Sequence, residues 1–173
     1  MKKSILIIAV TVTAIILSSC KKSSQVIEGP QPAIETTITA IASEWLSMQL
    51  TMVRNEDGSS YLEAVQTVND MNQYDLDSHY LLVYAKAPGR DSWVYNQLPT
   101  TITTDEGEVE ISATLDISRF AVQMINLSSN ASIDMQHFQN YQFRYLLVSA
   151  ADYQNLQVDW SDYEAVALAL HLS

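Results

Sequence analysis

The chain has 173 residues, of which 20 are acidic and 9 are basic, and its formal net charge is −11. Nucleic-acid binding depends on Lys and Arg side chains that neutralise phosphates, so this charge excludes a nucleic-acid-binding domain and argues equally against electrostatic docking on anionic lipid headgroups. The length suffices for one domain with its own hydrophobic core.

The first residues have the layout of a secretory signal peptide. Lys2 and Lys3 give a positive start, residues 5–17 are apolar and uncharged, and two serines precede Cys20. A membrane-spanning helix needs about 20 apolar residues, and this run is shorter. We therefore predict that residues 1–19 are removed, and the loss of the two lysines then takes the net charge from −11 to −13.

The residues that end in Cys20, Leu-Ser-Ser-Cys, resemble a lipobox, the processing motif of bacterial lipoproteins. The resemblance implies that cleavage exposes this cysteine, the only one in the chain, and that its thiol and amino group are acylated. Two or three acyl chains anchor a protein stably, whereas one does so only marginally. Residues 20–35 contain two prolines and are expected to form a flexible tether, and residues 36–173 a single domain. The predicted partner is therefore a membrane, reached through lipid on Cys20.

Beyond the tether the pattern is typical of β-strands. The expected strands cover residues 37–42, 47–53, 61–68, 80–85, 93–98, 108–117, 120–127 and 143–148. The clearest is 108–117, where strict alternation of apolar and polar residues indicates one buried and one solvated face. The preceding Asp105-Glu106-Gly107 suits a hairpin turn, because glycine supplies the positive φ that such turns use.

Three of these strands differ from the alternating pattern. Segments 80–85 and 143–148 are apolar on both faces, which is typical of central strands. Segment 61–68 also fits a helix, because Tyr61, Val65 and Val68 recur at helical spacing.

The end of the chain predicts a helix. Ser161 and Glu164 have the spacing of a capping box, in which the serine is the N-cap. The residues at helical spacing that are expected on its buried side are Tyr163, Val166, Ala167 and Leu170. Short strands followed by one helix predict a mainly β fold, an antiparallel β-sandwich of immunoglobulin-like or jelly-roll-like type with a short C-terminal helix packed on it.

Several stretches of the predicted domain form a recognisable set: Trp45, the run 82–86 (Leu-Val-Tyr-Ala-Lys), Trp93 with 97–99 (Gln-Leu-Pro), 143–148 (Phe-Arg-Tyr-Leu-Leu-Val) and 158–166 (Val-Asp-Trp-Ser-Asp-Tyr-Glu-Ala-Val). In these stretches the chain resembles small outer-membrane lipoproteins of the Bacteroides group. The resemblance covers most of residues 36–172 and implies a β-sandwich anchored in the outer membrane, with no activity or functional residue attached. Surface-exposed members often carry acidic residues after the lipidated cysteine, whereas this chain has Lys21 and Lys22. The sequence therefore does not decide whether the domain faces the periplasm or the exterior of the cell.

No catalytic residue is assigned. His79, His137 and His171 lie in no recognisable motif, and the chain has no Gly-x-Ser-x-Gly nucleophile elbow. A pair among the 20 acids could hydrolyse glycosides, but the sequence selects no pair.

No metal ligand or cofactor is assigned either. The acidic segment 70–77 fails the EF-hand pattern, because Tyr74, Asp75 and Leu81 occupy its fifth, sixth and twelfth positions, although a loop calcium site of another geometry stays open. Zinc is disfavoured, because the sole cysteine carries lipid and no paired-histidine spacing occurs.

Aromatic side chains are the best candidates for ligand binding. Trp93 and Tyr95 are two positions apart on an expected strand, so they share a face and could form a platform on which a sugar stacks. Trp45 and Trp160 are further candidates, and core packing is the competing interpretation for all four, with Trp160 expected to fasten the terminal helix to the sheet.

Three functional hypotheses follow. The first is a non-catalytic binding or structural lipoprotein of the cell envelope whose partner is a protein or a glycan. The second is a carboxylate-based glycan hydrolase. The third is a subunit of an envelope or surface assembly, in which a sheet edge accepts a partner strand.

Overall fold

A computed structural model describes residues 40–69, 71–128 and 133–172. The chain separates into two units, residues 1–35 and 36–173, and all described residues belong to the second. The predicted signal peptide, the lipidation at Cys20 and the tether lie outside the described residues. None of the helices in the described ranges has the length and apolar character needed to span a bilayer.

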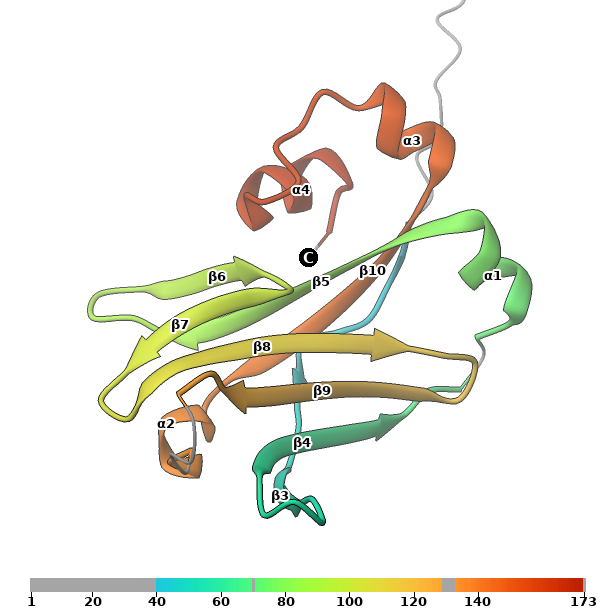
Figure 1. Cartoon of the computed structure of the whole chain (residues 1–173). Helices are drawn as coiled ribbons and strands as arrows, with labels where there is room; N and C mark the ends of the chain where they lie inside the picture. Colours follow the sequence, from blue (N-terminus) through green and yellow to red (C-terminus); the bar gives the residue numbers. More distant parts are fainter. Residues whose placement is uncertain (1–39, 70, 129–132, 173) are drawn as a thin grey trace, which may run out of the picture. The chain divides into compact units, whose positions relative to one another are not determined.

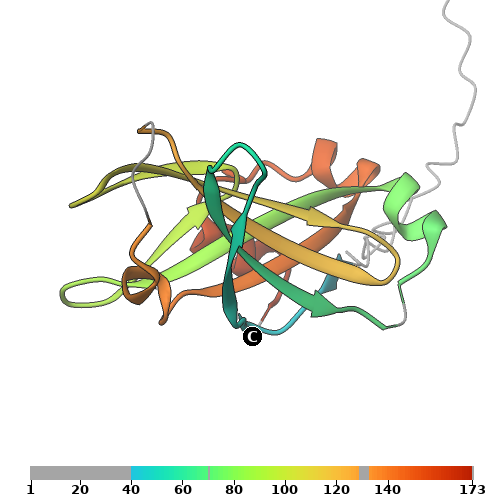
Figure 2. The same cartoon turned by 60° about the horizontal axis from the view of Figure 1, so that its bottom comes forward.

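The described residues form two antiparallel sheets that pack as a sandwich, with a short helix at the C-terminal end, so the predicted fold class is confirmed (Figures 1 and 2). The first sheet has the order β1 (Ala40–Ala42), β10 (Gln142–Ser149), β5 (His79–Pro88) and β6 (Trp93–Gln97), and β2 (Leu46–Ser47) also pairs with β10. The second sheet has the order β3 (Leu50–Arg54), β4 (Ser60–Thr67), β9 (Arg119–Asn126), β8 (Gly107–Leu115) and β7 (Thr100–Thr104). The helices are α1 (Gln73–Ser78), α2 (Met135–Phe138), α3 (Ala150–Asn155) and α4 (Tyr163–Ala169).

The main core lies between the two sheets and follows the period-two pattern. In β8, Val109 and Ile111 are fully buried, whereas the intervening Glu110 is only partly covered. Gly107 has a φ of +128°, as the hairpin prediction requires, and a Cβ there would lie 2.6 Å from Ser128 Oγ. The strand ends earlier than predicted, because Asp116 accepts hydrogen bonds from the N–H and hydroxyl of the nearby Ser118 and turns the chain.

The strands β5 and β10 are buried on both faces, as their sequences predicted. Val83 and Phe143 point into the core between the sheets. Tyr84 and Leu146 belong to a second core on the opposite face of the same sheet, where α4 and the chain before it cover them. The first sheet is therefore the middle layer of the domain, which explains why its central strands show no polar face.

Other predictions needed correction. The expected strand 47–53 is two strands in different sheets, β2 and β3, because the chain crosses from one sheet to the other between Ser47 and Leu50. Segment 61–68 is the strand β4, and its helical interpretation is wrong, because pairing with β3 and β9 on both sides fixes an extended backbone. The strand β7 and the helices α1 to α3 were not predicted, since all are short and lack a periodic apolar stripe.

The terminal helix is present, but its N-cap differs from the prediction. Asp162 is the N-cap, and its carboxylate accepts hydrogen bonds from the backbone N–H groups of Glu164 and Ala165. Ser161 is not available for this role, because its hydroxyl donates to Asp159 Oδ1 at 2.7 Å. An ionised carboxylate also interacts more favourably with the positive end of the helix than a hydroxyl does. The predicted buried side is confirmed, since Val166 is fully buried.

Candidate functional site

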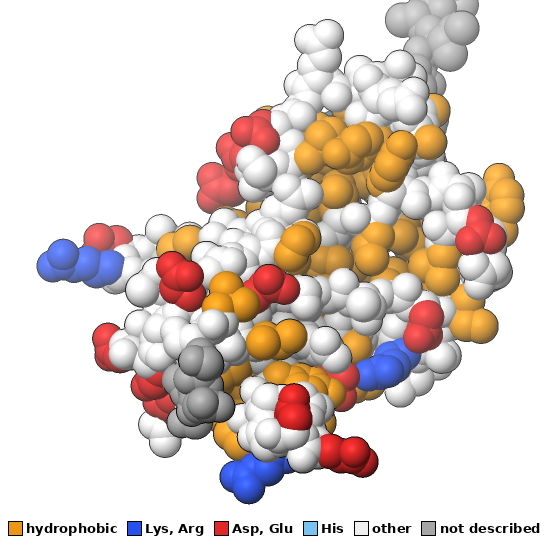
Figure 3. All heavy atoms as spheres, in the orientation of Figure 1, with side chains coloured by type: hydrophobic (Ala, Val, Ile, Leu, Met, Phe, Trp, Pro, Cys, Tyr) orange, Lys and Arg blue, Asp and Glu red, His pale blue; other side chains and the backbone are white. Residues whose placement is uncertain are grey.

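The predicted platform residues Trp93 and Tyr95 lie on β6, which is an edge strand of the first sheet. Their partners on β5 are Pro88 and Lys86. All four residues therefore share the sheet face that α4 and the C-terminal segment partly cover. Apolar side chains gather over α3, α4 and the strands beneath them on this side (Figure 3).

Tyr95 is part of the second core. Its ring stacks on Tyr163 of α4, with centroids 4.8 Å apart, and lies 5.7 Å from the ring of Trp45. Burial raises the pKa of its phenol, with smaller contributions from the neighbouring Tyr163 and Glu164. This ring therefore serves mainly to position α4 against the sheet.

Trp93 is different, because 44% of its surface stays exposed. The Lys86 ammonium nitrogen lies 4.5 Å from the centroid of the Trp93 ring and 5.3 Å from that of Trp45. Such cation–π contacts contribute roughly 0.5–1 kcal/mol at exposed sites. The indole of Trp93 is thus held in place by a cation at one side and remains open to solvent.

Lys86 was not predicted as a site residue, although its position in the sequence indicated that it could lie over an aromatic ring. It is the only charged residue in the strand β5. A lone lysine in such a strand, on the same face as two aromatic residues of its neighbour, indicates a cation held over rings.

A network of aromatic and polar groups lies between this face of the first sheet and the C-terminal segment. Arg144 is only 3% exposed, and its guanidinium donates to Tyr163 Oη at 2.6 Å and to the Ser43 carbonyl at 2.7 Å. Tyr84 donates its hydroxyl to the Trp160 carbonyl at 2.6 Å. Burial raises the pKa of Tyr84 well above its usual range, because the phenolate would be desolvated, and the nearby phenols and carboxylates of the C-terminal segment act in the same direction.

Trp160 has the role expected of it. Its ring stacks on Tyr153 of α3, with centroids 4.7 Å apart, and its carbonyl is tied to β5 through Tyr84. These contacts hold the segment that leads into α4 on the sheet. The covered face is therefore rigid, which is what a binding surface at its margin needs.

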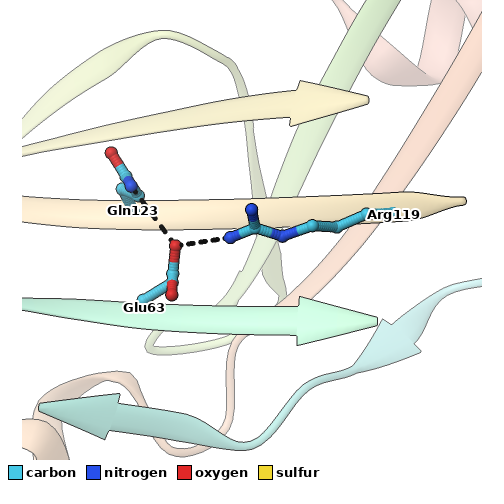
Figure 4. A network of polar contacts seen from close by, with 3 residues as sticks. All are labelled: Glu63, Arg119 and Gln123. Atoms are coloured by element: carbon cyan, nitrogen blue, oxygen red, sulfur yellow. Dashed lines mark hydrogen bonds and ion pairs between the residues drawn. The ribbon is translucent and has the colours of Figure 1, made fainter. Parts of the chain in front are cut away.

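A second polar group lies on the outer face of the second sheet. Glu63 of β4 accepts from Arg119 Nη2 at 2.8 Å and from Gln123 Nε2 at 3.3 Å, both on β9 (Figure 4). The arginine side chain is 47% exposed, so the pair is solvated and contributes at most about 1 kcal/mol. One carboxylate bound by a guanidinium and an amide acts as a brace between the neighbouring strands β4 and β9.

The histidines lie on separate elements. His79 begins β5, and its Nδ1 lies 2.9 Å from both Ser78 Oγ and the Asp75 carbonyl oxygen. His137 lies in α2, and His171 follows α4 with a φ of +53°.

Several aspartates within the described ranges serve turns and helix caps. In the acidic segment 70–77, where a loop calcium site stayed open, Asp70 lies outside the described residues, and Asp77 accepts a hydrogen bond from the Gln73 amide. The structure shows no group of three or more His, Cys, Asp or Glu side chains that could hold a metal ion within residues 40–69, 71–128 and 133–172. Three aspartates have carboxyl pKa values below the usual range because of hydrogen bonds from a serine two residues later: Asp57, Asp116 and Asp159.

No family model, no curated protein and no solved structure matches this chain. The candidate site thus depends on the geometry of Trp93, Lys86 and Tyr95 alone.

Proposed function

We propose that the chain is a lipid-anchored module of the cell envelope that binds a glycan without catalysing a reaction. The observation that carries the binding site is the exposed indole of Trp93, held by Lys86 at the margin of a rigid aromatic face. The lipobox-like residues before Cys20 support the anchor. The outer membrane is the proposed location, with the domain facing either the periplasm or the exterior.

The chemistry of the site suits a sugar ring. A pyranose presents a face of C–H groups that stacks on an indole, while its hydroxyl groups need polar partners at the edge of that contact. The Lys86 ammonium lies over one face of the indole, 4.5 Å from the ring centroid, so in this proposal the sugar stacks on the other face and the ammonium supplies N–H donors near the margin of that contact. In this proposal Tyr95 does not contact the sugar. Its ring stacks on Tyr163 and holds β6 against α4.

Replacing Trp93 by alanine should weaken glycan binding about tenfold. A stacked aromatic contact contributes roughly 0.5–1.5 kcal/mol beyond the area it buries, the lost area adds to this, and 1.4 kcal/mol corresponds to a factor of ten. A glycan array would identify the ligand, and calorimetric titration would give the change in affinity. Val94→Ala is the matched control, because Val94 is 47% exposed on the neighbouring position but points to the opposite face. Unchanged binding by Trp93→Ala would remove the proposed site.

Replacing Cys20 by serine should abolish lipid attachment, because the acceptor thiol is lost. Cells fed a clickable palmitate analogue should label the parent chain and leave Cys20→Ser unlabelled, and the variant should leave the membrane fraction. Each buried CH2 contributes about 0.8 kcal/mol, so the acyl chains supply the anchoring. Ser24→Ala, which keeps the thiol, should label normally. Label retained by Cys20→Ser would contradict the anchor, and protease shaving of intact cells would assign the face on which the domain lies.

A further inference from the structure

The last part of the domain packs on the first sheet without joining it. Residues 156–172, which we name the C-terminal strap, comprise the irregular chain after α3, the helix α4 and the turn that follows it (Figure 1). No strand of either sheet pairs with the strap, and among the described residues its backbone hydrogen bonds stay within residues 152–172. The strap is therefore held on the sheet by side-chain packing and by hydrogen bonds that involve side chains.

The strap belongs to one of the two cores only. Its buried side chains Tyr163, Val166 and Leu170 pack in the second core, on the outer face of the first sheet. The main core between the two sheets takes side chains from both sheets and from the region around α2, and it takes none from the strap. Loss of the strap contacts would therefore leave the main core complete.

Two hydrogen bonds from side chains of the first sheet fasten the strap at or before the start of α4. Tyr84 donates to the Trp160 carbonyl, and Arg144 donates to Tyr163 Oη, both at 2.6 Å. The helix itself has 7 residues, whereas an isolated helix needs about 12–15 residues to be stable in water. Once α4 leaves the sheet it should also lose its helical structure, so docking and helix formation occur together.

We propose that the C-terminal strap undocks and unfolds as one unit while both sheets stay folded. The central strands of the sheets are hydrogen-bonded on both sides, β5 by β10 and β6, and β9 by β4 and β8. Such strands open only when the whole domain unfolds, whereas segments with few bonds to their surroundings open at lower free energy. The strap therefore has a lower opening free energy than the sheet on which it packs.

Opening of the strap has a consequence for the surface around Trp93. Tyr163 of the strap contacts the rings of Trp45 and Tyr95, with centroids 4.9 Å and 4.8 Å away. Lys86 in turn lies over the rings of Trp45 and Trp93. Both rings that Tyr163 contacts lose this support when the strap opens, so the rigid arrangement at Trp93 belongs to the closed state. The opening itself does not require a glycan, so it can be tested whether or not the proposed glycan site exists.

The test is amide hydrogen exchange of the full chain, read by NMR under conditions in which closing is faster than exchange. The amides of Val166, Leu170 and Leu172 donate to carbonyls within the strap and report on its opening. Relative to an unstructured chain, they should exchange at least about tenfold faster than the amides of β5 and β9, and their opening free energy should fall less steeply with denaturant, because less surface is exposed. Equal opening free energies and equal denaturant slopes for the two sets would overturn the proposal.

Two matched substitutions separate strap opening from global unfolding. Val166 in the strap and Val122 in the main core are both fully buried, and threonine keeps the shape of valine while it buries a hydroxyl group. Val122→Thr should speed the exchange of the β5 and β9 amides about fivefold or more and leave the strap amides unchanged, because the closed and open states both contain this change. Val166→Thr should speed both sets of amides to a similar extent, because its contact is lost in strap opening and in global unfolding alike.

Either of two outcomes with these variants would overturn the proposal. Strap amides that speed up in Val122→Thr open only together with the whole domain. Strap amides that do not respond to Val166→Thr exchange by fraying of a helix that stays docked on the sheet.

Discussion

Replacing Val166 by aspartate should destabilise the domain by more than about 3 kcal/mol, whereas the same substitution at Leu168 should change stability by no more than roughly 0.5 kcal/mol. Val166 is fully buried in the second core, and Leu168, two residues later in α4, is 79% exposed. A carboxylate at Val166 would lose its hydration among Leu82, Tyr84 and Leu146, and the apolar side chains there cannot replace it.

The comparison isolates burial from the other effects of the substitution. Both positions lie in α4 and both variants gain the same carboxylate, so burial is the main difference between them. Leucine is a better helix former than valine, so helix propensity by itself would make the Leu168 variant the more costly one. Chemical denaturation would give the two free energies, and thermal unfolding should show a fall of about 10 °C or more for Val166→Asp alone. Equal stability of the two variants would mean that α4 does not cover the first sheet in solution.

The second large effect is expected at Arg144, a buried cation in the same core. Replacing Arg144 by leucine should cost about 3–5 kcal/mol, because the buried Tyr163 hydroxyl oxygen and the partly buried Ser43 carbonyl each lose a charged donor. Tyr163→Phe should cost about 1.5–3 kcal/mol, because it removes one acceptor of the guanidinium and keeps the ring contacts. Arg144→Lys should be intermediate, since an ammonium does not reproduce the guanidinium fork.

A double-mutant cycle measures whether these two residues act together. Arg144→Leu combined with Tyr163→Phe should cost at least about 1 kcal/mol less than the sum of the single changes, because the shared hydrogen bond can be lost only once. The measurement is the free energy of unfolding of all four proteins. Additivity within about 0.3–0.5 kcal/mol would contradict the 2.6 Å contact between the guanidinium and the phenol.

These two predictions concern the surface that supports Trp93. The indole lies at the margin of the face that α4 covers, and Tyr95 joins β6 to α4 through its stacking on Tyr163. Loss of α4 packing should therefore disturb the proposed glycan site indirectly. Binding by Val166→Asp should be compared with binding by Trp93→Ala only under conditions where both variants are folded.

Much of the fold could be predicted from local sequence, because strand patterns report burial directly. The alternation in 108–117 identified β8, and the apolar runs 80–85 and 143–148 identified the two strands that are buried on both faces. The helix and its buried side followed from the spacing of Tyr163, Val166 and Leu170. The N-cap was assigned one residue too early, because a neighbouring aspartate, Asp159, competes for the hydroxyl of Ser161.

Sequence by itself therefore determined the mainly β class, the central strands and the terminal helix, since periodicity and local hydrogen bonding depend on neighbours in the chain. It also placed Trp93 and Tyr95 on one face of a strand. Only the tertiary structure decided that Tyr95 is engaged by α4 while Trp93 stays open, that Lys86 lies over the indole, and that β6 ends its sheet. The physical reason is that exposure and pairing at these residues depend on α4 and β5, which are distant in sequence and whose packing no local pattern encodes.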